Sequence, residues 1–217
     1  MTRQAPPTNF TGTPVSTVLA KGTILSRVHL DIYGSATFNP VEADVLFGGG
    51  RFDSTNEDPY PYAYAADRDD VAVAEALLRD VLANDRGARF LAKRYWRSRQ
   101  ASRVITTEPI ELIRLVSGAD LGSIGQDTWL TMCDPDDYPQ TRAWAHWLRE
   151  QTPSAGGFQW VSKRDPSGRS FVLFGDRCPN ALAHEPGPLT SPCTFDTDEG
   201  LAWLRATLAG FRVAIRR

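Results

Sequence analysis

The sequence lacks most of the features by which a protein class is recognised at first sight. Its three cysteines, Cys133, Cys178 and Cys193, are too far apart for a CxxC pair or a zinc-binding pattern, so we expect free thiols and no metal site. The net charge of -2 excludes the strongly basic character of many nucleic-acid-binding proteins. No apolar run approaches the length of a membrane span, and the first residues contain no apolar signal-peptide segment. These absences predict a cytoplasmic protein in a reducing compartment, without a membrane partner.

What is present fits one globular domain. Hydrophobic residues make up 41% and charged residues 23% of the 217 residues, which is enough for a sizeable core. Residues 1–22 are rich in Pro, Thr and Gly and are expected to form a flexible N-terminal arm. No internal repeat and no second core is visible over residues 23–217. We therefore predict a single mixed α/β domain with a central mixed sheet flanked by helices.

Hydrophobic periodicity predicts the order of the elements. Alternating apolar residues indicate strands over residues 23–32, 62–66, 111–116, 159–162 and 170–174. Amphipathic spacing indicates helices over residues 87–100, 141–151 and 198–208, and another that is capped by Asp69 or Asp70 and runs to about residue 84. Loops or turns are expected over residues 33–50, 121–125, 165–168 and 179–191.

One carboxylate interrupts the apolar face of the first predicted helix. At 100° per residue from Val71, Leu78 and Leu82 lie about 20° to either side, and Glu75 lies about 40° away. Burying an unpaired carboxylate costs several kcal/mol, so Glu75 has either an ion-pair partner or a place in the wall of a ligand cleft. Helix geometry alone favours an ion pair, or a helix phase different from the assumed one, and leaves the cleft open as the functional alternative.

Arg51 follows three glycines, and a row of tyrosines follows Arg51. No GK[ST] or GxGxxG motif accompanies the glycines, but an arginine after such a loop can reach an anionic ligand with its planar guanidinium group. Tyr60, Tyr62 and Tyr64 alternate, so in an extended chain they point to the same side. Their rings suit stacking on a flat ligand, although half-buried strand tyrosines are the commoner case.

Together these segments resemble the RES domain family, which is named for its Arg, Glu and Ser. The resemblance covers residues 25–174 and is carried, in order, by LSRVH, GGGRF, YAYAA, VAVAE, ELIRLVSGADLGSIG, YPQTRAWAHWLRE and FQWVSKRDPSGRSFVLF. Each segment is short, but their order and spacing together are specific. Outside residues 25–174 the resemblance implies nothing.

The resemblance implies a fold similar to that of ADP-ribosyltransferases and a toxin of a bacterial toxin–antitoxin pair. RES proteins degrade NAD+ at the nicotinamide–ribose bond, by hydrolysis or by phosphorolysis, and are usually encoded beside an Xre-type antitoxin with a helix-turn-helix. For this chain the implied substrate is therefore NAD+, with no separate cofactor, and the implied partner is an Xre-type antitoxin. The resemblance leaves a homodimer open.

The resemblance also assigns roles to individual residues. Glu75 is implied as the key carboxylate, and Ser162 is implied to line the same cleft. Arg27 and Arg51 would hold phosphate or ribose oxygens. Nicotinamide leaves as a neutral group and needs no acid, so one carboxylate beside the oxocarbenium-like ribose is sufficient.

Tyr64, which lies eleven residues before Glu75, would stack on the nicotinamide or its ribose. Tyr62 competes for this position because the alternating tyrosines blur the register.

Two other functions stay open from the sequence alone. The first is transfer of ADP-ribose to a macromolecule, which usually needs a second acidic residue shortly before the catalytic one. Asp69 and Asp70 precede Glu75, but a helix would turn them away from it. The second is a non-enzymatic binding module in which Glu75 is paired to Arg51.

A basic run between residues 86 and 103 also needs an interpretation. Its aromatic residues, Phe90, Tyr95 and Trp96, could allow contact with RNA, with phosphates or with an acidic antitoxin segment. A solvated helix face is the commoner case, so direct nucleic-acid binding is not expected.

Overall fold

The computed structural model describes residues 5–9, 12–79, 81–185 and 193–216. In this part of the chain one curled sheet has the strand order β1-β6-β7-β8-β3-β2-β5-β10, and β9 also pairs with β5. Its strands are β1 (Ser16–Leu19), β2 (Ile24–Leu30), β3 (Tyr62–Ala66), β5 (Arg99–Thr106), β6 (Ile110–Leu115), β7 (Gly157–Val161), β8 (Arg169–Phe174), β9 (Leu182–His184) and β10 (Cys193–Thr194). The sheet is mixed because β6 and β7 are parallel while its other described pairs are antiparallel.

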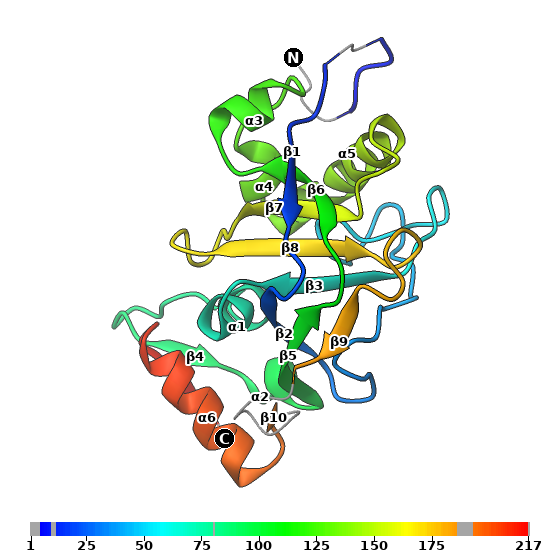
Figure 1. Ribbon diagram of the computed structural model, residues 1–217. Coiled ribbons are helices and arrows are strands. Elements are labelled where there is room, and N and C mark those ends of the chain that lie inside the picture. The colour runs from blue at the N-terminus through cyan, green and yellow to red at the C-terminus, as the bar shows by residue number, and fades with distance from the viewer. Residues whose placement is uncertain (1–4, 10–11, 80, 186–192, 217) are drawn as a thin grey trace.

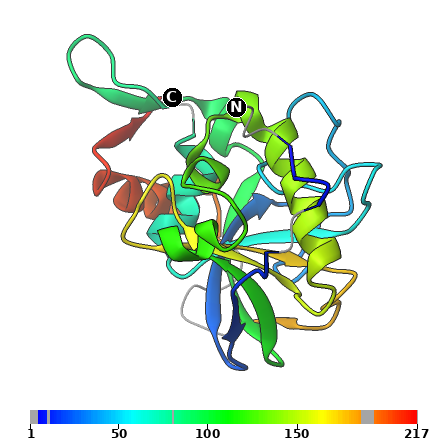
Figure 2. The same ribbon diagram turned by 90° about the horizontal axis from the view of Figure 1, so that it is seen from above.

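The helices lie in two groups at opposite ends of this sheet. They are α1 (Asp69–Leu77), α2 (Lys93–Trp96), α3 (Gly118–Gly122), α4 (Trp129–Met132), α5 (Tyr138–Gln151) and α6 (Asp198–Ala209). Figure 1 shows α3, α4 and α5 beside β1, β6 and β7, and shows α2 and α6 toward β5 and β10, with α1, the third helix of this group, beside β2 and β3. Seen from above, α5 (yellow-green) and α6 (red-orange) lie on opposite sides (Figure 2). A small parallel sheet of β4 (Arg89–Leu91) and β11 (Val213–Ile215) lies with the second group.

Each group of helices covers its own apolar cluster. Under α5, Trp144 packs with Phe52, Phe158 and Trp160. Under α6, residues of α1, α2 and β4 pack against Leu204 and Leu208. Burial of this much apolar surface is the main stabilising contribution to the fold, and it holds the strands between the clusters in place.

The structure confirms the predicted mixed α/β domain and most of its elements. The strand predicted over residues 62–66 is β3, and the four other predicted strands correspond to β2, β6, β7 and β8. The helices predicted over residues 141–151 and 198–208 are α5 and α6. The turn predicted over residues 165–168 is closed by a hydrogen bond from the Gly168 N–H to the Asp165 carbonyl (3.0 Å). These elements have strong periodicity, which is why the sequence alone predicts them.

Two predicted helices are wrong in extent or in kind. Helix α1 ends at Leu77 instead of near residue 84, and Leu82, which was expected on its apolar face, is 85% exposed. Residues 87–100 are not one helix, because β4 pairs with the C-terminal strand β11 and β5 begins at Arg99 beside β2. Only the single turn α2 remains helical. Pairing with distant strands overrides the local helical pattern here.

Three further segments have more structure than expected. The arm expected over residues 1–22 includes β1, which pairs with β6, so the sheet begins inside it. The loop expected over residues 179–191 includes β9; residues 186–191 of that prediction lie outside the described residues. The first two residues of the turn expected over residues 121–125 belong to α3, which begins with a reciprocal capping box between Ser117 and Asp120.

All three cysteines are free thiols, as predicted. None of the helices in the described residues is both long and apolar enough to span a bilayer.

Candidate functional site

A cleft of about 360 Å³ opens where β2 and β3 separate. The two strands share only one residue pair, Ser26 with Ala66. Beyond it, the Arg27 Nε–H donates to the Tyr64 carbonyl (3.1 Å), so a side chain occupies the place of a strand-to-strand bond. The cleft is lined by Ser26, Arg27, Val28, Gly50, Arg51, Tyr64, Ala65, Ala66, Ala72, Glu75, Ala76, Leu77, Arg79, Tyr95, Arg99, Tyr138, Trp160 and Ser170.

Glu75 lies in the last turn of α1, is half-buried and faces this cleft. The Ser162 hydroxyl donates to its Oε1 atom (2.5 Å), and the Arg164 backbone N–H donates to the same oxygen (3.1 Å). Both bonds fix the carboxylate through one oxygen and leave Oε2 without a hydrogen-bond partner in the described residues. The partners of Glu75 are a hydroxyl and a backbone N–H and not a cation, so the expected ion pair is absent from the described residues, whereas the place in the cleft wall is present.

Ser162 is fully buried behind Glu75 and does not line the cleft, which corrects the expectation that it would. It follows β7 directly, at the start of the turn that leads to β8. Its Oγ atom accepts the backbone N–H groups of Arg164 (3.2 Å) and Asp165 (3.0 Å) while it donates to Glu75. With both roles of its hydroxyl fixed, Ser162 can orient Glu75 but is not placed to touch a ligand.

Arg51 lines the cleft but is not paired to Glu75 in the described residues. Its guanidinium group donates to Cys133 Sγ (3.0 Å) and to the Cys133 carbonyl (3.3 Å), and lies 5.0 Å from the centre of the Tyr138 ring. The contacts of Arg51 thus do not support the module in which Arg51 neutralises Glu75. They leave a buried cation whose protein partners are neutral.

The glycine loop that carries Arg51 is held from two sides by residues that were not predicted. Gly48 and Gly49 have φ of 61° and 73°, a region that favours glycine, and a Cβ on Gly49 would lie 2.7 Å from Ala43. Asp53 accepts the Gly50 N–H (2.6 Å). Arg142 of α5 donates to the carbonyls of Gly48 (2.8 Å), Asp44 (2.9 Å), Val45 (3.2 Å) and Gly50 (3.3 Å). At 100° per residue, Arg142 lies about 160° from Trp144, on the opposite side from the predicted apolar face, so no sequence signal identifies it.

Arg27 is almost fully buried in the cleft wall. Besides Tyr64, its guanidinium group donates to the carbonyls of Ser35 and Thr37 and to no carboxylate in the described residues. Burial lowers the pKa of Arg27 to about 10, which still leaves it charged at neutral pH. The carbonyls fix the position of the charge without neutralising it.

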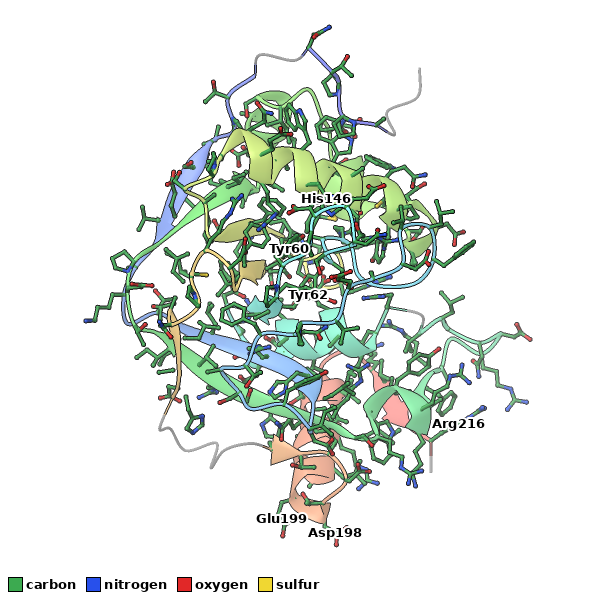
Figure 3. All side chains as sticks on the ribbon, turned by 90° about the vertical axis from the view of Figure 1, so that its right-hand side faces the viewer. Tyr60, Tyr62, His146, Asp198, Glu199 and Arg216 are labelled. Carbon is green, nitrogen blue, oxygen red and sulfur yellow. The ribbon has the colours of Figure 1, made fainter. Side chains whose placement is uncertain are left out.

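The structure distinguishes between the two candidate tyrosines. Their rings stand in one row with Tyr60, with edge-to-face contacts of 6.3 Å between Tyr60 and Tyr62 and 5.8 Å between Tyr62 and Tyr64, which confirms that they share one side. Tyr62 lies with Tyr60 below α5, the helix that carries His146 (Figure 3), and does not line the cleft. Tyr64 does line it, and its hydroxyl donates to Asp53 (2.8 Å). Burial, and next the charge of Asp53, raises the pKa of Tyr64, which keeps it neutral.

Several cleft residues come from segments that periodicity did not predict correctly. Arg79 follows the early end of α1, and Tyr95 and Arg99 belong to the basic run that was expected on a solvated helix. Because that run is divided between β4, α2 and β5, part of it turns inward. Tyr138 and Trp160 complete the aromatic lining.

The two aspartates before Glu75 face other partners, as the helix geometry predicted. Asp69 forms an ion pair with Arg103 (2.6 Å) and accepts the Ser26 hydroxyl (2.5 Å). Burial alone would raise the pKa of Asp69, but these two hydrogen bonds hold it below its usual range. Asp70 pairs with Arg68 (3.0 Å). Glu75 is thus the one carboxylate among the cleft-lining residues of the described chain.

Comparisons with known proteins agree with this architecture. The sequence model of the RES domain matches residues 24–196. Among solved structures, a chain of the M. tuberculosis MbcT–MbcA toxin–antitoxin complex aligns with a TM-score of 0.53 and 14% sequence identity, over 77% of this chain and 84% of that chain. At this identity the likeness shows a shared fold. No curated protein matches the chain.

Proposed function

The chain belongs to the RES domain family, and on this basis we propose that it is the toxin of a bacterial toxin–antitoxin pair and cleaves the nicotinamide–ribose bond of NAD+. The observation that carries the proposal is the cleft itself, in which one oriented carboxylate, Glu75, lies in a wall that also presents four arginines and three aromatic rings beside Tyr64. A positively charged cleft suits the diphosphate of a dinucleotide, and the rings suit its flat bases.

Cleavage of the nicotinamide–ribose bond requires mainly a negative charge that is correctly positioned beside the ribose. Nicotinamide departs as a neutral molecule, so no acid has to protonate it, and the ribose carbon becomes positively charged in the transition state. Glu75 supplies the negative charge that stabilises this cation, and the hydrogen bonds from Ser162 and Arg164 fix it before the substrate arrives. The acceptor of the ribosyl group is either water or inorganic phosphate.

Arg27 and Arg51 are assigned to the phosphate and ribose oxygens. Each is held by backbone carbonyls or a neutral sulfur, so the guanidinium group is oriented before binding and little conformational entropy is lost. Tyr64 is assigned to stack on the nicotinamide or its ribose. Its hydroxyl is already engaged by Asp53 and by the Phe52 N–H (2.9 Å), which fixes the ring.

The expected partner is an Xre-type helix-turn-helix antitoxin. MbcT, the structural neighbour, is a toxin solved with its antitoxin MbcA, which supports the same kind of pairing for this chain. Expression of the protein alone should arrest bacterial growth, and co-expression with the product of a neighbouring helix-turn-helix gene should restore it. Growth unaffected by well-folded protein would contradict the toxin role.

Incubating purified protein with NAD+ tests the activity directly. We expect stoichiometric release of free nicotinamide, together with ADP-ribose if water is the acceptor or its 1-phosphate if inorganic phosphate is. Adenine-labelled NAD+ distinguishes the alternative, because transfer to a macromolecule would place the label on protein or nucleic acid. The separate pairing of Asp69 and Asp70 does not favour that alternative. Intact NAD+ after long incubation would reject the proposal.

A further inference from the structure

The cleft carries more positive charge than its proposed substrate can neutralise. Its lining residues include four arginines, Arg27, Arg51, Arg79 and Arg99, against the single carboxylate of Glu75. NAD+ brings two negative charges on its diphosphate and one positive charge on its nicotinamide. With NAD+ bound, two positive charges in the cleft remain without a counter-charge, although burying unneutralised charge is costly.

Three carboxylates near the cleft wall do not supply the missing charge, because each lies near a cation that does not line the cleft. Asp69 is paired to Arg103 at 2.6 Å, and Asp134 is paired to Lys163 at 2.6 Å. Burial lowers the pKa of Arg142 and the nearby charge of Asp53 opposes this shift, so Asp53 interacts with a cation outside the cleft. The surplus positive charge therefore belongs to the cleft and not to a wider neutral network.

Of the four cleft arginines, Arg79 and Arg99 have the fewest hydrogen bonds to described residues, so their guanidinium groups are available to bind an anion. The Arg79 guanidinium group has one weak hydrogen bond, to the Gly49 carbonyl (3.3 Å), and lies 5.4 Å from the Tyr138 ring, which Arg51 also contacts. The Arg99 side chain donates no hydrogen bond to any described residue. Burial, and next the charge of Arg79, lowers the pKa of Arg99, so the two guanidinium groups lie close enough to repel one another. An anion between them would remove that repulsion.

We infer that Arg79 and Arg99 form a subsite for one phosphate group beyond the diphosphate of the dinucleotide. The inference rests on the proposed function and extends it to the choice of substrate. A phosphate dianion would neutralise both remaining charges, and paired guanidinium groups match its oxygens in geometry. The phosphate comes either from an ester on the adenosine ribose, as in NADP+, or from free inorganic phosphate bound beside the dinucleotide.

Steady-state nicotinamide release separates the two sources. We compare Arg79→Gln and Arg99→Gln with Arg97→Gln, an exposed arginine of the same basic run that does not line the cleft. If the ester is bound, the ratio of kcat/KM for NADP+ to kcat/KM for NAD+ falls about tenfold in both cleft variants, which is the effect of one lost charge-assisted hydrogen bond. If free phosphate is bound, the half-saturating phosphate concentration for NAD+ cleavage rises about tenfold instead. Arg99→Lys, which keeps the charge, should recover part of either effect.

Both readouts are ratios or concentrations, so a general loss of folded protein does not move them. If neither readout differs between the cleft variants and Arg97→Gln, the subsite is overturned. Calorimetric titration with inorganic phosphate alone separates this outcome from failure of the proposed function. Phosphate that binds wild-type protein about tenfold more tightly than Arg99→Gln, in a protein that releases no nicotinamide, would support the subsite and reject the NAD+ activity.

Discussion

Arg51 and Arg149 are both buried arginines that lie over a tyrosine ring, but they differ in what neutralises them. Arg149 of α5 lies 3.7 Å from the Tyr60 ring centre and pairs with Asp58 (2.7 Å) and Asp176 (2.8 Å). Arg51 lies 5.0 Å from the Tyr138 ring centre and contacts Leu130 and Cys133 only through uncharged atoms. The first arrangement is complete within the protein, whereas the second needs an anion from outside. Arg51 also lines the cleft, unlike Arg149, so we expect a ligand in the cleft to supply that anion.

The largest expected effect on stability is at Arg149, whose charge is neutralised within the protein. Arg149→Met keeps most of the side-chain volume but leaves two carboxylates without their cation. The free energy of unfolding should fall by about 3 kcal/mol, the low end for a broken buried pair, because both carboxylates are partly exposed. Urea denaturation measures this as a lower midpoint at an unchanged slope. An unchanged midpoint would show that the ion pairs of Arg149 do not stabilise the fold, and Arg149 would then not differ from Arg51 in this respect.

The opposite result is expected at Arg51, whose described partners are all uncharged. Arg51→Gln removes a cation that nothing in the described protein neutralises, so the free energy of unfolding should change by less than about 1 kcal/mol. On the same folded protein, kcat/KM for NAD+ should fall by about 10- to 100-fold through loss of a phosphate contact. If Arg51→Gln unfolds as readily as Arg149→Met but keeps wild-type turnover per folded molecule, Arg51 is a structural residue and not a phosphate contact.

A smaller loss is expected where the protein orients its carboxylate. Ser162→Ala removes the 2.5 Å hydrogen bond to Glu75 and should lower kcat about tenfold with little change in KM, because the substrate does not contact Ser162. Ser54→Ala is the matched control, since Ser54 is also fully buried but its hydroxyl has no hydrogen-bond partner among the described residues. Equal kinetics for the two variants would show that Ser162 does not act through Glu75.

The smallest effect is a pH dependence that arises from the burial of His29 and, next, from its proximity to the charge of Arg27. Burial, and next the charge of Arg27, lowers the pKa of His29 from 6.5 to about 4. Between these pH values the unfolded chain binds a proton that the folded protein does not, so His29 lowers stability as the pH falls from 6.5 to 4. His29→Gln should flatten this part of the curve of denaturation midpoint against pH. A variant curve parallel to that of the wild type would contradict the shift.

The sequence predicts the frame of this molecule better than its cleft. Strands β3 and β8 are short runs buried on both faces, and the helix α5 has a period that burial on one face imposes, so all three can be recognised locally. The division of residues 87–100 depends on the pairing of β4 with β11 and of β5 with β2, which lie far away in the chain. Arg99 reaches the cleft as part of β5 and Arg79 follows the early end of α1, and no local pattern identifies them.

Glu75 and Arg51 were predicted for a different reason. A carboxylate on an apolar helix face and an arginine after three glycines each break a local rule, and such exceptions concentrate at functional sites. The geometry of Ser162 could not be predicted in the same way, because its position behind Glu75 depends on the turn between β7 and β8. The hydrogen bonds from Arg142 to the glycine loop likewise depend on how α5 packs.

The nicotinamide released from NAD+ by Glu75→Gln is the most direct test of the central claim. Glutamine keeps the shape and removes the negative charge, so the rate should fall on the order of 10²-fold or more while the denaturation midpoint stays near that of the wild type. Glu199→Gln, on the exposed first turn of α6 at the far end of the molecule (Figure 3), should leave the rate unchanged. Near wild-type nicotinamide release by folded Glu75→Gln protein would contradict the account.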